Sequence, residues 1–131
     1  MTNTKFNSVL IVGVGLIGSS LARAIKENDL AINIYGIDNN LNNLKKCEEL
    51  KLLSRGESSL DNFSEQFDMI IICSPLSTYK KIFFNLNNYI SRDTLITDVG
   101  STKMSVINNF NETVTNKHLF FIPSHPIAGL E

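Results

Sequence analysis

The fold is decided by residues 9–18, VLIVGVGLIG, where a short apolar run passes directly into closely spaced glycines. The run over residues 8–12 predicts a strand buried on both faces, and apolar residues recur at helical spacing from residue 16 onward. Gly13, Gly15 and Gly18 therefore form a G-x-G-x-x-G pattern at a strand-to-helix turn. We expect Gly13 to permit the tight turn, Gly15 to let a pyrophosphate approach the backbone, and Gly18 to let helix and strand pack closely.

The start of the predicted helix supplies the groups that would bind this anion. Backbone amides at Leu16, Ile17 and Gly18 have no partner within a helix that starts here, and they lie at the positive end of its dipole. These residues are predicted to belong to a dinucleotide-binding site. A tight turn that binds nothing is the alternative, because the glycine pattern is weak evidence when it stands alone.

Asp38 follows the second apolar run and lies 20 residues beyond Gly18. At that position a carboxylate can accept hydrogen bonds from the hydroxyls of an adenosine ribose. It would also repel a 2′-phosphate, and residues 39–43, NNLNN, contain no arginine to bind one. The sequence therefore predicts NAD as the cofactor in preference to NADP. The alternative role for Asp38 is to cap the helix that starts near Leu41.

Short apolar runs alternate with longer stretches of helical period, which is typical of parallel strands joined by crossover helices. Strands are predicted at residues 8–12, 33–37, 69–73, 95–97 and 119–122. Helices are predicted at residues 16–28, 41–50, 78–89 and 102–114. The polar stretch 52–65 has room for a short edge strand, whose position the pattern does not fix. The predicted fold class is α/β, a single Rossmann-type domain over residues 1–131, doubly wound, with a mainly parallel sheet and helices on both faces.

Composition narrows the classes of function. The 131 residues suffice for about one domain, and 12 basic against 13 acidic residues give a net charge of −1, without the basic patch that nucleic-acid binding needs. No uninterrupted apolar run approaches the roughly 18 residues of a membrane helix, because Gly13, Gly15 and Gly18 interrupt the longest one. We therefore expect a soluble cytoplasmic protein that binds neither nucleic acid nor membrane.

Cys47 and Cys73 lie far apart, and each falls in an apolar pattern. We interpret both as buried small hydrophobic residues rather than redox groups or metal ligands, and we predict no metal site. This use of cysteine suits a reducing compartment. Asparagine is frequent, in pairs such as residues 39–40 and 42–43, and these pairs are interpreted as compositional, without a chemical role.

Ligands of open α/β sheets bind beyond the carboxyl ends of the strands, so the residues after each apolar run are candidates. Ser74 and Pro75 follow the 69–73 run, beside the position expected for the nicotinamide ribose, although forming a loop is the default role of a proline there. Asp98 follows the next run and could face the ligand. These three residues are predicted to contact the cofactor. Ser101 or Thr102 could cap the helix that follows.

His125 lies at a proline-containing turn just beyond the last predicted strand, within residues 123–129, PSHPIAG. With a reference pKa of ~6.5, a neutral imidazole can accept a hydroxyl proton while hydride leaves the same carbon system. His125 is therefore the candidate catalytic base, and a structural turn histidine is the alternative. His118 lies among polar residues and is assigned no function.

Three stretches together resemble the prephenate and arogenate dehydrogenase family of tyrosine biosynthesis. They are residues 9–22, VLIVGVGLIGSSLA, residues 98–103, DVGSTK, and residues 125–131, HPIAGLE. The first pattern occurs in many nucleotide-binding enzymes, whereas the other two in this order are more specific, and the resemblance covers nearly the whole chain. It implies NAD-dependent oxidative decarboxylation of prephenate or arogenate. By this resemblance His125 accepts the hydroxyl proton, and Ser101 hydrogen-bonds the same region and helps to orient substrate and imidazole.

Members of this family continue into a helical domain that forms the dimer and supplies an arginine for the substrate carboxylate. The resemblance therefore implies that residues 1–131 are a cofactor domain, isolated or truncated, that binds NAD and is nearly inactive alone. Two alternatives stay open. One is a dinucleotide-binding module without chemistry, or half of a two-chain enzyme. The other is a related Rossmann reductase that acts on a β-hydroxy acid or an imine.

Overall fold

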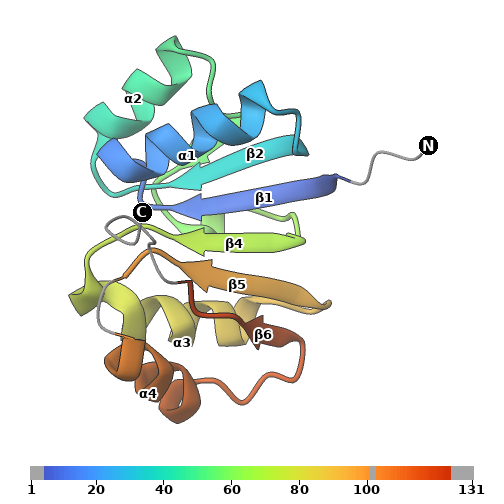
Figure 1. The fold of residues 1–131 in the computed structure, drawn as a ribbon, viewed down its shortest axis with the longest axis vertical. Coiled ribbons are helices and arrows are strands. Elements are labelled where there is room, and N and C mark those ends of the chain that lie inside the picture. The colour runs from blue at the N-terminus through green and yellow to red at the C-terminus, as the bar shows by residue number, and fades with distance from the viewer. Residues whose placement is uncertain (1–4, 101–102, 125–131) are drawn as a thin grey trace, which may run out of the picture.

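The strands of the computed structural model, which describes residues 5–100 and 103–124, form one sheet in the order β3-β2-β1-β4-β5-β6 (Figure 1). Every pairing between neighbouring strands is parallel. The strands are β1 (Phe6–Val12), β2 (Ala31–Ile37), β3 (Arg55–Glu57), β4 (Met69–Ile72), β5 (Thr94–Asp98) and β6 (Leu119–Phe121). The order reverses at β1, which lies between β2 and β4, and ligands of this fold class bind at such a point.

Four α-helices connect these strands, and two short 3-10 turns accompany them in the described residues. The helices are α1 (Leu16–Glu27), α2 (Leu41–Glu49), α3 (Tyr79–Tyr89) and α4 (Lys103–Thr113), and the 3-10 turns are η1 (Leu60–Asn62) and η2 (Leu76–Thr78). In Figure 1, α1 and α2 lie beside β1 and β2, whereas α3 and α4 lie beside β5 and β6. None of the helices in these residues combines the length and the apolar character that crossing a membrane requires.

Alternate residues of the central strands pack into two separate cores, one on each face of the sheet. Leu10 and Val12 of β1 belong to the core that contains Tyr79 and Phe83 of α3, together with Val106 of α4. The neighbouring residues Val9 and Ile11 belong to the other core, which contains Ala22 and Ile25 of α1 and Cys47 of α2. The sheet is therefore covered by helices on both faces, which confirms the predicted doubly wound α/β fold.

The register brings the carboxyl ends of the central strands into one line. Val12 of β1 pairs with Ile37 of β2 on one side and with Ile72 of β4 on the other. Ile72 in turn pairs with Asp98, the last residue of β5. The glycine turn, Asp38 and the loops after β4 and β5 therefore emerge at the same edge of the sheet.

The edge strand β3 is where the sequence pattern was least informative. It has only three residues and lies inside the polar stretch 52–65, and it pairs with β2 through Tyr35↔Arg55 and Ile37↔Glu57. The other bounds differ from the predicted ones by small shifts. For example, β2 begins two residues earlier than expected, and α3 begins at Tyr79 after the 3-10 turn η2. Thr102, the predicted first residue of the fourth helix, lies outside the described residues.

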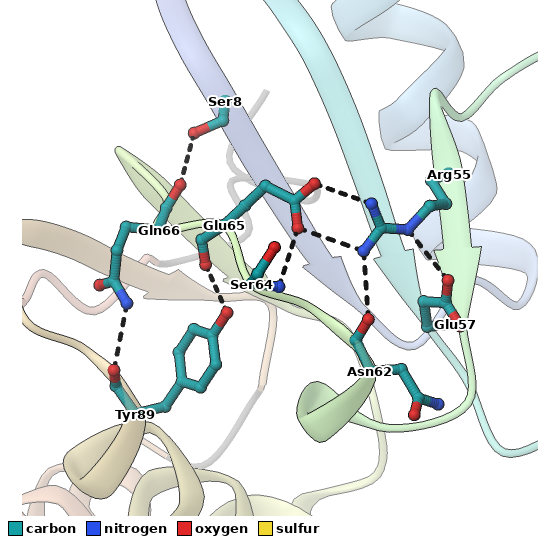
Figure 2. Close-up of polar contacts among 8 residues, drawn as sticks. All are labelled: Ser8, Arg55, Glu57, Asn62, Ser64, Glu65, Gln66 and Tyr89. Atoms are coloured by element: carbon teal, nitrogen blue, oxygen red, sulfur yellow. Dashed lines mark hydrogen bonds and ion pairs between the residues drawn. The ribbon is translucent and has the colours of Figure 1, made fainter.

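The connection from β3 to β4 is held by the side chain of Arg55 (Figure 2). Its guanidinium donates two hydrogen bonds to the Glu65 carboxylate, at 2.7 and 3.1 Å, and a third to Glu57 at 2.9 Å. It also lies over the ring of Phe63, with 4.6 Å between the guanidinium carbon and the ring centroid. The hydrogen bond from Arg55 holds the pKa of Glu65 below its ordinary value. These contacts fix the edge strand that supports β2.

Candidate functional site

Gly13 and Gly18 are required by the internal packing of the turn after β1. Gly13 has a φ of 92°, a conformation that residues with a side chain rarely adopt. A Cβ on Gly13 would also lie 2.9 Å from the backbone nitrogen of Ser74. A Cβ on Gly18 would lie 1.9 Å from the carbonyl oxygen of Gly13. The predicted structural roles of both glycines, a tight turn and close helix–strand packing, are confirmed.

Gly15 differs, because nothing in the described residues crowds it. The nearest atom to a Cβ placed on Gly15 would be Asn43 Nδ2, at an ordinary contact distance of 3.8 Å. Leu16 and Ile17, which follow it, are 86% and 55% exposed. Packing among the described residues therefore does not account for a glycine here, whereas a ligand that approached the backbone at this position would require one.

The beginning of α1 suits an anion. Gly15 is its N-cap and has no side chain to accept from the first amides, and the first turn holds no acidic residue. The first intrahelical bond in this turn runs from the Ser19 amide to the Gly15 carbonyl oxygen, at 2.9 Å. The amides of Leu16, Ile17 and Gly18 precede that bond, so they have no partner within the helix and lie at the positive end of its dipole. The residues present thus fit a diphosphate.

The Asp38 carboxylate faces the glycine turn. Its Oδ2 accepts hydrogen bonds from the Val14 amide at 2.9 Å and from Asn43 Nδ2 at 3.1 Å. Its Oδ1 accepts from the Asn40 amide at 2.8 Å. The side chain is half-buried. Asp38, which follows β2, is therefore hydrogen-bonded directly to the glycine turn after β1.

Two asparagines in this region have local functions that the sequence interpretation missed. Asn40 is the N-cap of α2, and its side chain accepts hydrogen bonds from the amides of Asn42 and Asn43. The alternative in which Asp38 caps this helix is therefore wrong. Asn43 donates its side-chain amide to Asp38. The preference of asparagine for N-cap positions could have identified Asn40 from the sequence, but no sequence signal pairs Asn43 with Asp38.

The loop after β4 contacts the glycine turn through its backbone, since Ser74 N lies beside Gly13. The Ser74 hydroxyl hydrogen-bonds the Thr78 hydroxyl at 2.8 Å, and the Thr78 hydroxyl donates to the Pro75 carbonyl oxygen at 2.6 Å. Ser74 and Pro75 thus lie at the predicted edge, within a well-bonded loop. The preceding Cys73 is a free, partly buried thiol. Burial, and to a smaller extent Asp98, raises its pKa to about 12.

The Asp98 side chain is buried, whereas the sequence had predicted that it would face a ligand. Its side chain is 0% exposed. Its Oδ2 accepts a hydrogen bond from the Gly100 amide at 2.8 Å and lies 3.3 Å from the Tyr79 hydroxyl. Burial, and secondarily the Asp98 charge, raises the pKa of Tyr79. In this structure the Asp98 carboxylate fixes the chain after β5, and contact with a cofactor stays a prediction.

Ser101 and His125 lie outside the described residues, so their predicted catalytic roles stay predictions. The described part of the chain has no group of three or more His, Cys, Asp or Glu side chains that could hold a metal ion. His118, to which no function was assigned, has its Nδ1 2.9 Å from an Asp93 carboxylate oxygen, and both side chains are largely exposed.

Comparison with known proteins decides the family. Residues 21–131 match the protein-family model for the nucleotide-binding domain of prephenate dehydrogenase. The chain belongs to this family. The matched residues include Asp38, Asp98, Ser101 and His125, and the glycine turn lies just before them.

Two curated relatives and one solved structure show what the chain is similar to. A cyclohexadienyl dehydrogenase of Zymomonas mobilis is 30% identical over 98% of the chain, and a prephenate dehydrogenase of Lactococcus lactis is 31% identical over 92%. The crystal structure of prephenate dehydrogenase from A. aeolicus, in complex with hydroxyphenyl propionate and NAD+, is 29% identical over 99% of the chain, with a TM-score of 0.76. The chain spans 43%, 34% and 45% of these three proteins, respectively.

Proposed function

We propose that the chain binds NAD, with the diphosphate at the start of α1 and the adenosine ribose at Asp38. The observation that carries this proposal is that Asp38 accepts a hydrogen bond from Val14, in the same turn in which no described residue crowds Gly15. The ribose of a dinucleotide is joined to its diphosphate, so both sites have to be adjacent. The related enzyme from A. aeolicus was solved with NAD+.

The same carboxylate favours NAD over NADP. A 2′-phosphate on the ribose would meet the negative charge of Asp38, and residues 39–43 contain neither arginine nor lysine to offset it. Asn40 and Asn43, which surround the carboxylate, are neutral. The expected preference is therefore set by repulsion of the wrong cofactor as well as by attraction of the right one.

For the reaction we propose oxidative decarboxylation of prephenate or arogenate, on the basis of the family match and of the relatives' names. His125 accepts the proton of the ring hydroxyl as that carbon is oxidised, and Ser101 hydrogen-bonds the same region and orients it. Bound NAD supplies the acceptor for the hydride. The bond to the ring carboxylate then breaks, its electron pair enters the ring as carbon dioxide leaves, and the oxygen takes back a proton to give the phenol.

We further propose that, in the whole protein, the dimer contact and an arginine that binds the substrate carboxylate come from a helical domain outside residues 1–131. The support is that the chain spans less than half of the relatives named above. Residues 1–131 alone would then bind NAD but convert little substrate. The free thiols Cys47 and Cys73 suit the reducing cytoplasm that we propose as the location.

The test is a fluorescence titration of the purified chain with NADH and with NADPH. We expect saturable NADH binding, weaker NADPH binding, and a loss of at least about tenfold in NADH affinity in Asp38→Ala, because charged hydrogen bonds to the ribose disappear. Asp93→Ala is the matched control, since Asp93 is an exposed aspartate paired with His118 away from the glycine turn. Absence of NADH binding in the wild-type chain would overturn the proposal.

The catalytic part is tested separately. Prephenate-dependent formation of NADH by residues 1–131 alone would refute the need for a second domain. In a chain joined to the helical domain of a relative, His125→Asn should leave NADH affinity unchanged and reduce turnover by at least about a hundredfold. Unchanged turnover would remove His125 from the mechanism without affecting the cofactor proposal.

A further inference from the structure

We propose that Asn43 is a second ribose-binding residue, which shares the two ribose hydroxyls with Asp38. This inference rests on the proposed NAD function. In the proposed arrangement, one ribose hydroxyl donates a hydrogen bond to Asp38 Oδ1, and the other accepts a hydrogen bond from Asn43 Nδ2.

The first step is the hydrogen-bonding capacity of Asp38. A carboxylate offers about four acceptor positions, two on each oxygen. Oδ2 already accepts from the Val14 amide and from Asn43 Nδ2, and Oδ1 accepts from the Asn40 amide. One position, on Oδ1, is left for a ligand. The carboxylate thus has room for one ribose hydroxyl in this arrangement, and the other needs a different partner.

The second step is the orientation of the Asn43 amide. A carboxylate accepts but does not donate, so the Asp38 charge fixes the NH2 end of Asn43 toward it. That nitrogen carries two hydrogens, and Asp38 Oδ2 is its one acceptor among the described residues. The Asn43 side chain is half-buried rather than enclosed. A second donor hydrogen therefore remains for a ligand.

The third step is position. Asn43 Nδ2 lies 3.1 Å from Asp38 Oδ2 and 3.8 Å from where a Cβ on Gly15 would stand. The amide thus lies between the carboxylate that holds the ribose and the glycine at which the diphosphate approaches. In a dinucleotide the adenosine ribose links the adenine to the diphosphate, so it has to pass this amide. Asn43 comes from α2, whereas Asp38 and Gly15 follow β2 and β1.

The experiment measures binding of ADP, 2′-deoxy-ADP, 3′-deoxy-ADP and 2′,3′-dideoxy-ADP by calorimetry. The proteins are the wild-type chain, Asn43→Ala, and the control Asn42→Ala, whose side chain is exposed on the same helix turn. For wild type, removal of either hydroxyl should weaken binding. Asn43→Ala should weaken ADP binding about tenfold, leave dideoxy-ADP binding unchanged, and abolish the penalty for one of the two deoxy analogues. Asn42→Ala should match wild type.

Each other outcome overturns the inference in a recognisable way. Equal weakening of ADP and dideoxy-ADP in Asn43→Ala would mean that Asn43 only supports the shape of the site. If Asn43→Ala reduced the affinity losses of 2′-deoxy-ADP and 3′-deoxy-ADP equally, Asn43 would act solely by holding Asp38. If Asn43→Ala does not fold, the wild-type series still tests the proposal, because loss of affinity on removal of only one of the two hydroxyls would contradict it. Failure of the wild-type chain to bind either ADP or NADH would instead refute the proposed function itself.

Discussion

The hydroxyl of Tyr79 lies 3.3 Å from a carboxylate oxygen of Asp98, and neither side chain is exposed to solvent. Asp98 is the last residue of β5, and the same oxygen accepts from the Gly100 amide. A buried carboxylate is costly unless its acceptors are satisfied. The pair therefore couples α3 to the chain that leads from β5 toward Ser101.

Tyr79→Phe should reduce the free energy of unfolding by about 1–3 kcal/mol, since it takes a donor from a buried carboxylate while keeping the ring in its core. Urea unfolding followed by circular dichroism measures the change. Tyr35→Phe is the control, because the Tyr35 ring packs against Phe63 and Phe67 in the same core cluster. Equal, small effects of both substitutions would mean that the Tyr79 hydroxyl does not stabilise Asp98.

Stability should fall above pH 9 because of Cys73. Burial raises the pKa of this thiol from about 9 to about 12, so between these values the unfolded chain loses the proton while the folded chain keeps it. The contribution of Cys73 to the free energy of unfolding is therefore fully present below pH 9. It decreases by at most about 1.4 kcal/mol per pH unit as the pH rises toward 12. Urea midpoints measured from pH 8 to 11 should decline less steeply in Cys73→Ala. Parallel curves for the two proteins would contradict this role.

Part of the decline in stability that remains in Cys73→Ala at high pH should come from Tyr79. The pKa of Tyr79 is also raised, so the folded chain keeps that proton at a pH where the unfolded chain has lost it. The double variant Cys73→Ala/Tyr79→Phe should therefore be flatter still, although less stable at neutral pH.

Local sequence signals were enough to predict the centre of the fold. The apolar residues of β1 and the glycines after it depend on burial on both faces and on a single turn, which short stretches encode directly. The strand β3 was not placed, because Arg55, Gly56 and Glu57 have no apolar run and form a strand only by pairing with Tyr35, Gly36 and Ile37. Pairing between distant segments leaves little trace in a short polar stretch.

The candidate site was also predicted from the sequence only in part. The position of Asp38 beside the glycine turn followed from spacing, but its bonds to Val14 and Asn43 join three different segments and could not be read from any one of them. Asparagines that were interpreted as compositional include the cap of α2, Asn40. Asp98 was expected at the surface because it ends a strand, yet its side chain turns inward to Tyr79. Strand ends indicate where a site lies, but not which way each side chain points.

Arg55→Ala should lower the melting temperature more than Arg92→Ala does. Arg55 bonds two glutamates and covers the Phe63 ring, whereas Arg92 forms one 3.0 Å ion pair with Asp68. The pKa of Glu65 is lowered by Arg55, so this contribution is present above the ordinary carboxyl pKa of 4.5 and is lost as the pH falls through the lowered value. Calorimetric scans at pH 7 and at pH 3 should therefore show a larger difference between wild type and Arg55→Ala at pH 7. A difference that does not change with pH would assign the effect to contacts that do not titrate, namely packing on Phe63 and the hydrogen bond to the Asn62 carbonyl oxygen.

Alanine substitutions at Gly15 and Gly18 should separate binding from folding. A Cβ on Gly18 would stand 1.9 Å from a backbone oxygen that cannot move without opening the turn, so Gly18→Ala should cost at least about 2 kcal/mol of unfolding free energy. Among the described residues, a Cβ on Gly15 meets nothing nearer than 3.8 Å, so Gly15→Ala should change stability by less than about 1 kcal/mol. It should nevertheless weaken NADH binding at least about tenfold, because the methyl group would occupy the space through which the diphosphate reaches the backbone. Urea unfolding and NADH titration of both variants measure the two effects. If Gly15→Ala bound NADH as tightly as wild type, the diphosphate would not approach the chain at this residue, and the open surface over Gly15 would need another explanation.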